Sequence, residues 1–130
     1  MIGGIFALFL LGATSTKDFS DMEGDRAHGC VTLPVRFGVA RAAKIMAPFF
    51  VLPWLLIPVF TWLSGDWRLT GNSVFLTALG LALAAWGVYV ARLLLKNPED
   101  LASTENHPAW THMYLMLMTA QAGFALGYVV

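Results

Sequence analysis

The chain has 130 residues, of which 58% are hydrophobic and only 12% are charged. A soluble domain carries about 25% charged residues, so this composition argues against a soluble globular protein and indicates one embedded in a lipid bilayer. Eight basic and eight acidic residues cancel. No overall positive charge draws the chain to nucleic acid, and we expect no nucleic-acid partner.

Four long uncharged ranges follow one another along the chain. A helix needs about 20 apolar residues to cross the hydrocarbon core, and the last three ranges reach or approach that length. The first range is shorter, and no basic residue precedes it as in a signal peptide, so we interpret it as a span that lacks its beginning. The sequence therefore predicts an all-α, polytopic transmembrane helical bundle with spans at about residues 1–16, 44–64, 71–93 and 110–130.

The basic residues predict the orientation of these spans. Five of the eight Lys and Arg residues fall between Lys17 and Lys44, whereas the second connection holds only Arg68. Connections rich in Lys and Arg stay on the cytoplasmic side of a membrane. We therefore expect an integral, multi-pass protein of the inner or plasma membrane, with a cytoplasmic acidic loop at residues 17–43.

Prolines, glycines and tryptophans mark the expected spans. Pro48, Pro53 and Pro58 predict a bend in the second span, which serves either to line a cavity or only as scaffold. Gly80 and Gly87 indicate close helix packing in the third span. Four tryptophans lie at or near expected span ends, as interfacial aromatic residues do: Trp54, Trp62, Trp67 and Trp110.

The first connection carries the most informative motif, Asp18-x-x-Asp21-x-x-x-Asp25. If it continues the preceding helix, the three carboxylates share a face about 60° wide, whereas Glu23 points about 140° away. Three like charges so close together repel one another unless a cation neutralises them. The spacing suits Mg²⁺, which takes one or two protein carboxylates and keeps positions for waters and phosphate oxygens. A solvated acidic loop is the alternative, and spacing alone leaves it equally open.

Residues 17–38, KDFSDMEGDRAHGCVTLPVRFG, strongly resemble the second aspartate-rich motif of the UbiA superfamily of membrane prenyltransferases. Asp21 and Asp25 match the paired aspartates of that motif, and Asp18 matches an additional upstream aspartate of many members. The TLPVRFG segment that follows matches as well. Residues 105–114, ENHPAWTHMY, are similar to the entry to the last helix of the family. The resemblance covers nearly the whole chain.

The resemblance implies a bundle of about nine spans, in which two aspartate-rich motifs hold Mg²⁺ ions that bind an isoprenyl diphosphate. It implies that Asp21 and Asp25 are catalytic metal ligands and that Asp18 is a further ligand or a neighbour of one. Lys17 and Arg26 flank the cluster and would contact the diphosphate, although both serve equally well as a topology signal. The implied reaction transfers an isoprenyl group from a polyprenyl diphosphate donor to a hydrophobic or aromatic acceptor within the membrane.

The chain departs from the family pattern because it has four predicted spans and one aspartate motif. We therefore expect it to be the C-terminal half of such an enzyme, to need a partner half that carries the first motif, and to be inactive as this chain alone. The alternative is a non-enzymatic small membrane subunit whose acidic cluster binds a cation. An ion path would place carboxylates near the middle of spans, and the last three predicted spans contain none.

Overall fold

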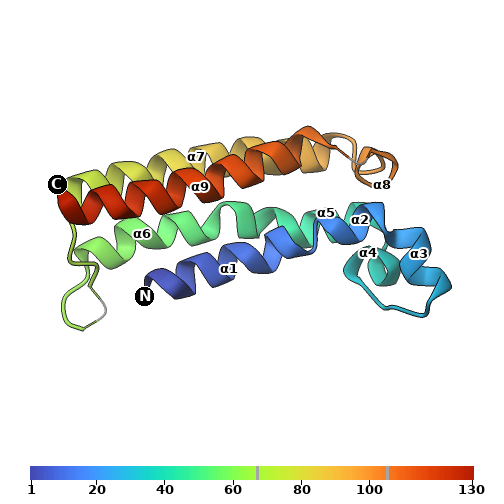
Figure 1. Ribbon diagram of the computed structural model, residues 1–130, viewed down its shortest axis with the longest axis horizontal. Helices are drawn as coiled ribbons and strands as arrows, with labels where there is room; N and C mark the ends of the chain where they lie inside the picture. The colour runs from blue at the N-terminus through green and yellow to red at the C-terminus, as the bar shows by residue number, and fades with distance from the viewer. Residues whose placement is uncertain (67, 105) are drawn as a thin grey trace.

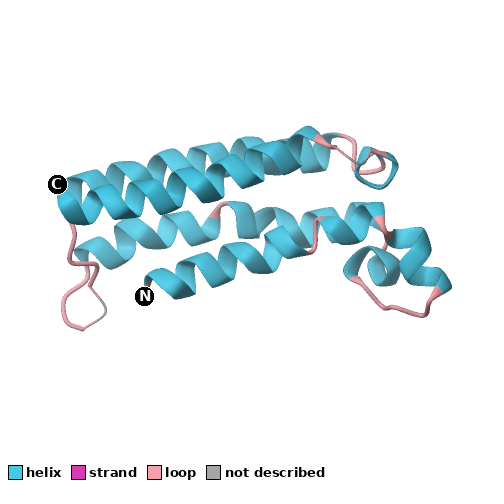
Figure 2. Ribbon diagram, viewed as in Figure 1, coloured by secondary structure: helices cyan, strands magenta, loops and turns pink. Residues whose placement is uncertain are grey.

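The computed structural model describes residues 1–66, 68–104 and 106–130, and none of these residues forms a β-strand. The prediction of an all-α fold is confirmed (Figure 2). In chain order the helices are α1 (Ile2–Thr14), α2 (Lys17–Ser20), α3 (Met22–Ala27), α4 (Leu33–Phe37), α5 (Val39–Met46), the 3₁₀ helix η1 (Ala47–Phe50), α6 (Leu52–Trp62), α7 (Ser73–Lys96), α8 (Asp100–Ser103) and α9 (Pro108–Val129). Trp67, expected at a span end, and Glu105, expected in the entry to the last helix, lie outside the described residues.

The long helices run up and down through an elongated bundle (Figure 1). The chain passes through α1, returns through α5, η1 and α6, and then passes through α7 and back through α9. Helix α6 packs on α7, and α7 packs on α9. Both chain ends lie at one end of the bundle, and the short helices α2, α3, α4 and α8 gather at the opposite end. The acidic segment therefore belongs to one end of the bundle.

Three helical runs, Ile2–Ser20, Val39–Trp62 and Ser73–Lys96, are long and apolar enough to cross a membrane. They overlap the first three predicted spans, and the chain is an integral membrane protein. Helix α9 has 22 residues, but polar residues such as His112 and Gln121 lower its mean hydropathy. That α9 also crosses the bilayer stays a prediction.

The predicted acidic loop at residues 17–43 is folded into short helices, so its description as a loop was wrong. The second helical run begins at Val39, several residues before the expected position. Gly38, with a φ of 80°, adopts the left-handed conformation that ends α4 and turns the chain into α5. The charges of Arg41 and Lys44 suggested a loop, but both lie on the exposed face of a helix whose apolar face is buried.

The second run is interrupted at its prolines. Pro48 lies in η1, Pro53 lies in the first turn of α6, and Pro58 lies inside α6. A proline has no N–H to donate to the carbonyl four residues earlier, so Pro58 leaves the carbonyl oxygen of Trp54 without its helical partner. In a bilayer such a carbonyl must be covered by protein.

Two glycines of α7 let that helix cover the interrupted run. A Cβ atom on Gly80 would lie 2.9 Å from the carbonyl oxygen of Trp54, and a Cβ atom on Gly87 would overlap the carbonyl oxygen of Phe50. Any larger residue would push the two helices apart. The predicted close packing at Gly80 and Gly87 is confirmed. Because this packing covers the interrupted run, it supports the scaffold interpretation of the prolines.

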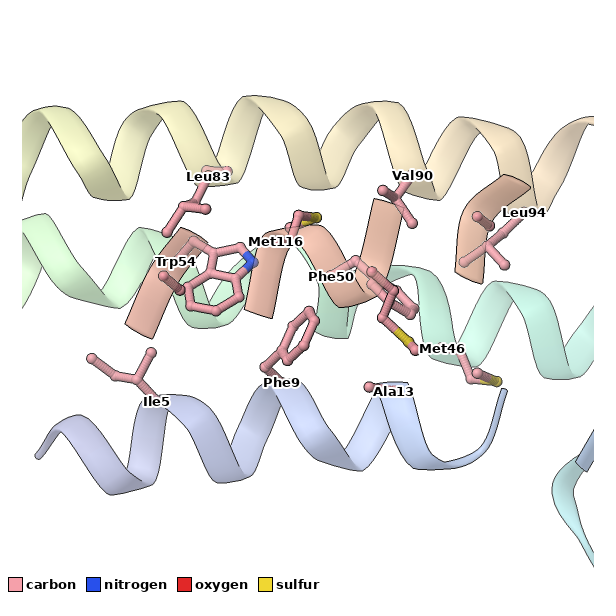
Figure 3. Packing of buried hydrophobic residues seen from close by; sticks show 14 of the residues in the cluster. Ile5, Phe9, Ala13, Met46, Phe50, Trp54, Leu83, Val90, Leu94 and Met116 are labelled. Carbon is pink, nitrogen blue, oxygen red and sulfur yellow. The ribbon is translucent and has the colours of Figure 1, made fainter. Parts of the chain in front are cut away.

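Aromatic rings fill the space between α1 and the interrupted run (Figure 3). The ring centroid of Phe9 lies 5.7 Å from that of Phe50 and 4.8 Å from that of Trp54. Phe6 makes an edge-on contact with Trp54 at 6.0 Å. Trp54 is fully buried, so its expected place at the membrane interface was wrong: its ring is needed to fill the core between α1 and α7. Trp62, at the end of α6, is exposed as expected.

Replacing Gly87 by Ala should destabilise the protein by about 1–3 kcal/mol, because the added methyl group would collide with the backbone of Phe50. Gly4→Ala is the matched control, because nothing lies within 4 Å of a Cβ atom at Gly4 in α1. Thermal unfolding of the detergent-solubilised chain, followed by circular dichroism, measures both variants. Equal midpoints for the two variants would show that α7 does not pack as described.

Candidate functional site

The helical run that begins with α1 carries the acidic residues to the end of the bundle. After α1 the chain turns at Thr16, whose buried hydroxyl donates a hydrogen bond to the carbonyl of Ala13 at 2.6 Å. The backbone then resumes a helical course through α2 and α3. The amide of Asp21 donates to the carbonyl of Lys17 at 3.3 Å, and the amide of Asp25 donates to that of Asp21 at 2.8 Å. Helical hydrogen bonds therefore continue across the bend at Asp21.

This backbone course gathers the three aspartates. Asp18 and Asp25 are half-buried and Asp21 is exposed. The Asp18 carboxylate lies close enough to both Asp25 and Asp21 to feel the repulsion of their negative charges. Glu23 is exposed and instead borders a cavity between α2, α3 and α8. The helical-face interpretation of the motif thus matches the structure, both for the three aspartates and for the separate position of Glu23.

An apolar contact holds the acidic turn in place. Phe19, next to Asp18, is fully buried. Its ring centroid lies 6.3 Å from that of Trp110 in the first turn of α9, with the rings tilted by 33°. Helix α2 also contacts α8 and α4. The carboxylates therefore stand on a packed base, although their own side chains reach toward water.

The three aspartates could supply part, but not all, of the coordination shell of a Mg²⁺ ion. In the described ranges, no group of three acidic, histidine or cysteine side chains converges closely enough to hold a metal ion by itself. Mg²⁺ commonly uses one or two carboxylates and completes its shell with waters and substrate phosphate oxygens. Asp18, Asp21 and Asp25 offer that type of ligand at neighbouring positions. The ring Nδ1 of His28 lies 2.7 Å from the carbonyl oxygen of Gly24, and among the described residues His28 forms no three-member group with the aspartates that could hold a metal ion.

A groove between the α1–α2 segment and α9 lies beside the acidic turn. It consists of two adjoining cavities of about 250 and 280 Å³, which share Thr16, Lys17 and Tyr114. The first cavity is mostly apolar and is lined further by Phe9, Leu10, Ala13, Thr14, Met113 and Leu117. The second is more polar and is lined further by Ser20, Asn106 and Trp110. We call the two together the α1–α9 groove.

The structure separates the two cations that the sequence placed beside the carboxylates. Lys17 lines both cavities of the α1–α9 groove, whereas Arg26 is exposed at the end of α3 and lines neither. None of the three aspartates lines either cavity. The acidic face and the groove are therefore neighbouring features, and Lys17 is the residue next to Asp18 that belongs to the groove.

A ligand-binding role was not predicted for the α9 residues that line the groove, and Trp110 was expected only as an interfacial aromatic residue. Trp110 and Tyr114 are four residues apart near the start of α9, so both lie on one side of the helix and face α2. That spacing of two aromatic residues was the available signal. It did not identify the groove, because the facing wall comes from Lys17 and Ser20, about ninety residues earlier in the chain.

A sequence model of the UbiA prenyltransferase family matches residues 1–117. The digeranylgeranylglyceryl phosphate synthase of Methanoregula boonei is 38% identical over 88 residues, which make up 63% of this chain and 31% of that enzyme. The enzyme of the same name from Natronomonas pharaonis is 36% identical over 92 residues, or 65% of this chain and 33% of the relative.

A pigment-related protein is similar over a longer stretch. The bacteriochlorophyll synthase 33 kDa chain of Cereibacter sphaeroides is 28% identical over 116 residues, which make up 89% of this chain and 36% of that protein. The chain thus spans about a third of the length of these curated relatives. No solved structure matches it. The resemblance noted on residues 17–38 is confirmed at the level of the family.

His107 caps the start of α9. Its buried ring accepts a hydrogen bond at Nδ1 from the amide of Ala109 at 3.2 Å, which caps α9. The same ring packs against Trp110, with centroids 5.7 Å apart. Burial lowers the pKa of His107, and the nearby negative charge of Asp100 opposes that shift. The folded protein therefore favours the neutral ring that can act as the cap.

The lowered pKa of His107 predicts a loss of stability in acid. Because the unfolded chain binds this proton more readily than the folded chain, stability is full above the ordinary histidine pKa of about 6.5 and falls as the pH drops below it. The unfolding midpoint of the solubilised chain should therefore be lower at pH 5.5 than at pH 7.5. His107→Asn keeps a capping oxygen without a titrating ring and should reduce this difference.

His28→Asn is the control for that experiment, because His28 is exposed and lies outside α9. The prediction requires that His107→Asn reduces the difference more than this control does. If His107→Asn retained the full difference between the two pH values, the titrating group would have to be another one.

Proposed function

Because the chain belongs to the UbiA prenyltransferase family, we propose that it supplies part of a site that transfers an isoprenyl group from a polyprenyl diphosphate to a lipid or aromatic acceptor. The observation that carries the proposal is the position of Asp18, Asp21 and Asp25. They gather at the end of an apolar helical run, next to a groove that changes from apolar to polar. Relatives named for the synthesis of digeranylgeranylglyceryl phosphate and of bacteriochlorophyll support a hydrophobic acceptor.

Asp21 and Asp25 are the proposed catalytic metal ligands, and Asp18 is a further ligand or a neighbour that orients one. Their carboxylate oxygens are the ligand type that Mg²⁺ prefers. Bound Mg²⁺ would neutralise charge on the diphosphate and stabilise it as a leaving group. Without a cation, the three negatively charged carboxylates would repel a diphosphate. They would attract it only through a bound metal ion.

Lys17 is the better supported of the two proposed diphosphate-binding cations. It lines the groove immediately beside Asp18, where its ammonium group can pair with a phosphate oxygen. Arg26 lies further along α3 and outside the groove. Its exposed guanidinium remains available to a diphosphate held on the acidic face, and it keeps a secondary role in the proposal.

The apolar cavity of the α1–α9 groove suits an isoprenyl chain. Each methylene group transferred from water into such a cavity contributes about 0.8 kcal/mol. A chain lying against Phe9, Ala13 and Leu117 would place its polar end near Lys17, where the second cavity begins. The groove would thus exclude water from the tail and orient the diphosphate toward the acidic turn.

The proposal includes a partner segment. The three aspartates would bind only part of a metal shell, and the chain spans about a third of its curated relatives. The remaining ligands would come from a further helical part that carries another aspartate-rich motif. The alternative, a small subunit that binds a cation without catalysis, is less well supported, because the carboxylates lie at a helix end beside a groove of substrate size.

The proposal can be tested in a chimera. The segment of the Methanoregula boonei relative that matches this chain would be replaced by it, and isoprenyl transfer would be assayed in membranes with Mg²⁺ and with excess chelator. We expect Mg²⁺-dependent transfer by the chimera and none by the chain alone. Asp21→Asn combined with Asp25→Asn should reduce kcat/KM at least about a hundredfold, because charge stabilisation of the leaving group is lost.

Glu23→Gln is the matched control, because Glu23 sits between the two aspartates in sequence but borders a different cavity. It should retain activity. Helical content and expression of each variant would be checked by circular dichroism and gel filtration. Full activity of the double variant in a well-folded chimera would exclude the catalytic assignment.

A further inference from the structure

A second group of charged residues follows the acidic segment along the chain. Arg36, Arg41 and Lys44 are all exposed, and we call them the basic patch. No Asp or Glu occurs between Arg26 and Gly65. The positive charge of this segment is therefore not balanced by acidic residues of its own, and the proposed transfer reaction does not use it.

The fold presents the basic patch outward. Helix α5 buries its apolar face against the bundle. At 100° per residue, Arg41 and Lys44 lie about 60° apart, on the side opposite that buried face. Helix α4 packs on α5 and brings Arg36 to the same end of the run. The three cations thus cluster at the beginning of the Val39–Trp62 run.

The exposed face of this run continues from basic to apolar residues. Beyond Lys44, the exposed positions at spacings of three or four residues are Pro48, Leu52, Leu55 and Val59. Leu52 is 54% exposed and Val59 is 53% exposed. An apolar stripe on a membrane-spanning helix faces lipid chains, so the basic end of the same stripe lies at the level of the headgroups.

The dimensions of the run agree with this placement. Its 24 residues extend about 36 Å, which exceeds the roughly 30 Å of the hydrocarbon core. The excess of about 6 Å corresponds to about one turn, and the charge of Arg41 favours the first turn as the part outside the hydrocarbon. Lys44, one turn further along, can extend its long side chain to the headgroups. Phe37 and Ile45, each 41% exposed, lie beside the cations, and the guanidinium of Arg36 lies 5.3 Å from the centroid of the Phe37 ring. Cations flanked by exposed apolar side chains suit the boundary between headgroups and chains.

We propose that the basic patch binds the phosphate groups of anionic phospholipids in the bilayer. Each Lys or Arg near an anionic membrane surface strengthens binding about fivefold. Two such cations on the lipid-facing stripe and a third in α4 beside its start, with no acidic residue in the segment, select an anionic headgroup over a zwitterionic one. A mere topology signal acts during membrane insertion and requires no such selectivity in the folded protein.

The test reconstitutes the chain in phosphatidylcholine vesicles and compares the association of spin-labelled phosphatidylglycerol with that of spin-labelled phosphatidylcholine. The wild-type chain should prefer phosphatidylglycerol, and the preference should weaken as salt is raised. In the variant Arg36→Gln/Arg41→Gln/Lys44→Gln, the preference for phosphatidylglycerol over phosphatidylcholine should fall at least about tenfold. The control variant Arg68→Gln/Arg92→Gln/Lys96→Gln changes the net charge equally, at exposed residues elsewhere, and should keep most of it.

Three results would overturn the proposal: no lipid preference in the wild-type chain, equal losses in the two triple variants, or displacement of phosphatidylglycerol by soluble diphosphate. The last result would identify a free anion as the occupant, and an absent preference would show that the patch does not select anionic lipids. Circular dichroism would check folding. Should the first variant not fold, the single variants Arg41→Gln and Lys44→Gln and the salt dependence of the wild-type chain decide the question in the same assay.

Discussion

The need to cover backbone carbonyls inside a bilayer governs this structure. Lipid offers no hydrogen bonds, so each carbonyl that a proline releases must be shielded by another part of the protein. Pro58 releases the carbonyl of Trp54, and Gly80 allows α7 to lie directly against it. Because α7 also packs on α9, this one close approach determines the relative position of three long helices. Helix α1 then joins them through its aromatic contacts.

The acidic turn depends on that framework for its position. Phe9 holds α1 against Phe50, and Phe19 holds α2 against Trp110 at the start of α9. These two contacts fix the position of the backbone that carries the three aspartates. In the described part of the chain, the aspartate side chains themselves form no hydrogen bond. Such an arrangement suits metal-binding side chains that must bind and release a charged molecule. Apolar packing keeps the backbone rigid, so no protein partner competes for the carboxylates.

Local patterns predicted what depends on local geometry. Gaps between charges located the long helices, helical periodicity placed Asp18, Asp21 and Asp25 on one face, and Gly80 with Gly87 marked a close helix contact. Features that depend on distant partners were not predictable. Charges at Arg41 and Lys44 suggested a loop because only the burial of the other face reveals α5. The α1–α9 groove joins Lys17 to Tyr114, which no sequence spacing connects, and Trp54 was misplaced because its environment comes from α1 and α7.

The buried indole of Trp54 has a consequence for how this position can vary. Its Nε1 hydrogen has no acceptor among the described residues, although its ring contacts Phe6 and Phe9. A donor left unpaired in an apolar core is a cost that a hydrocarbon ring does not carry. The bundle thus needs the size and flatness of this side chain but not its polarity. Substitution by another large aromatic residue would keep the contacts, whereas a small residue would leave a void at the joint between α1 and α6.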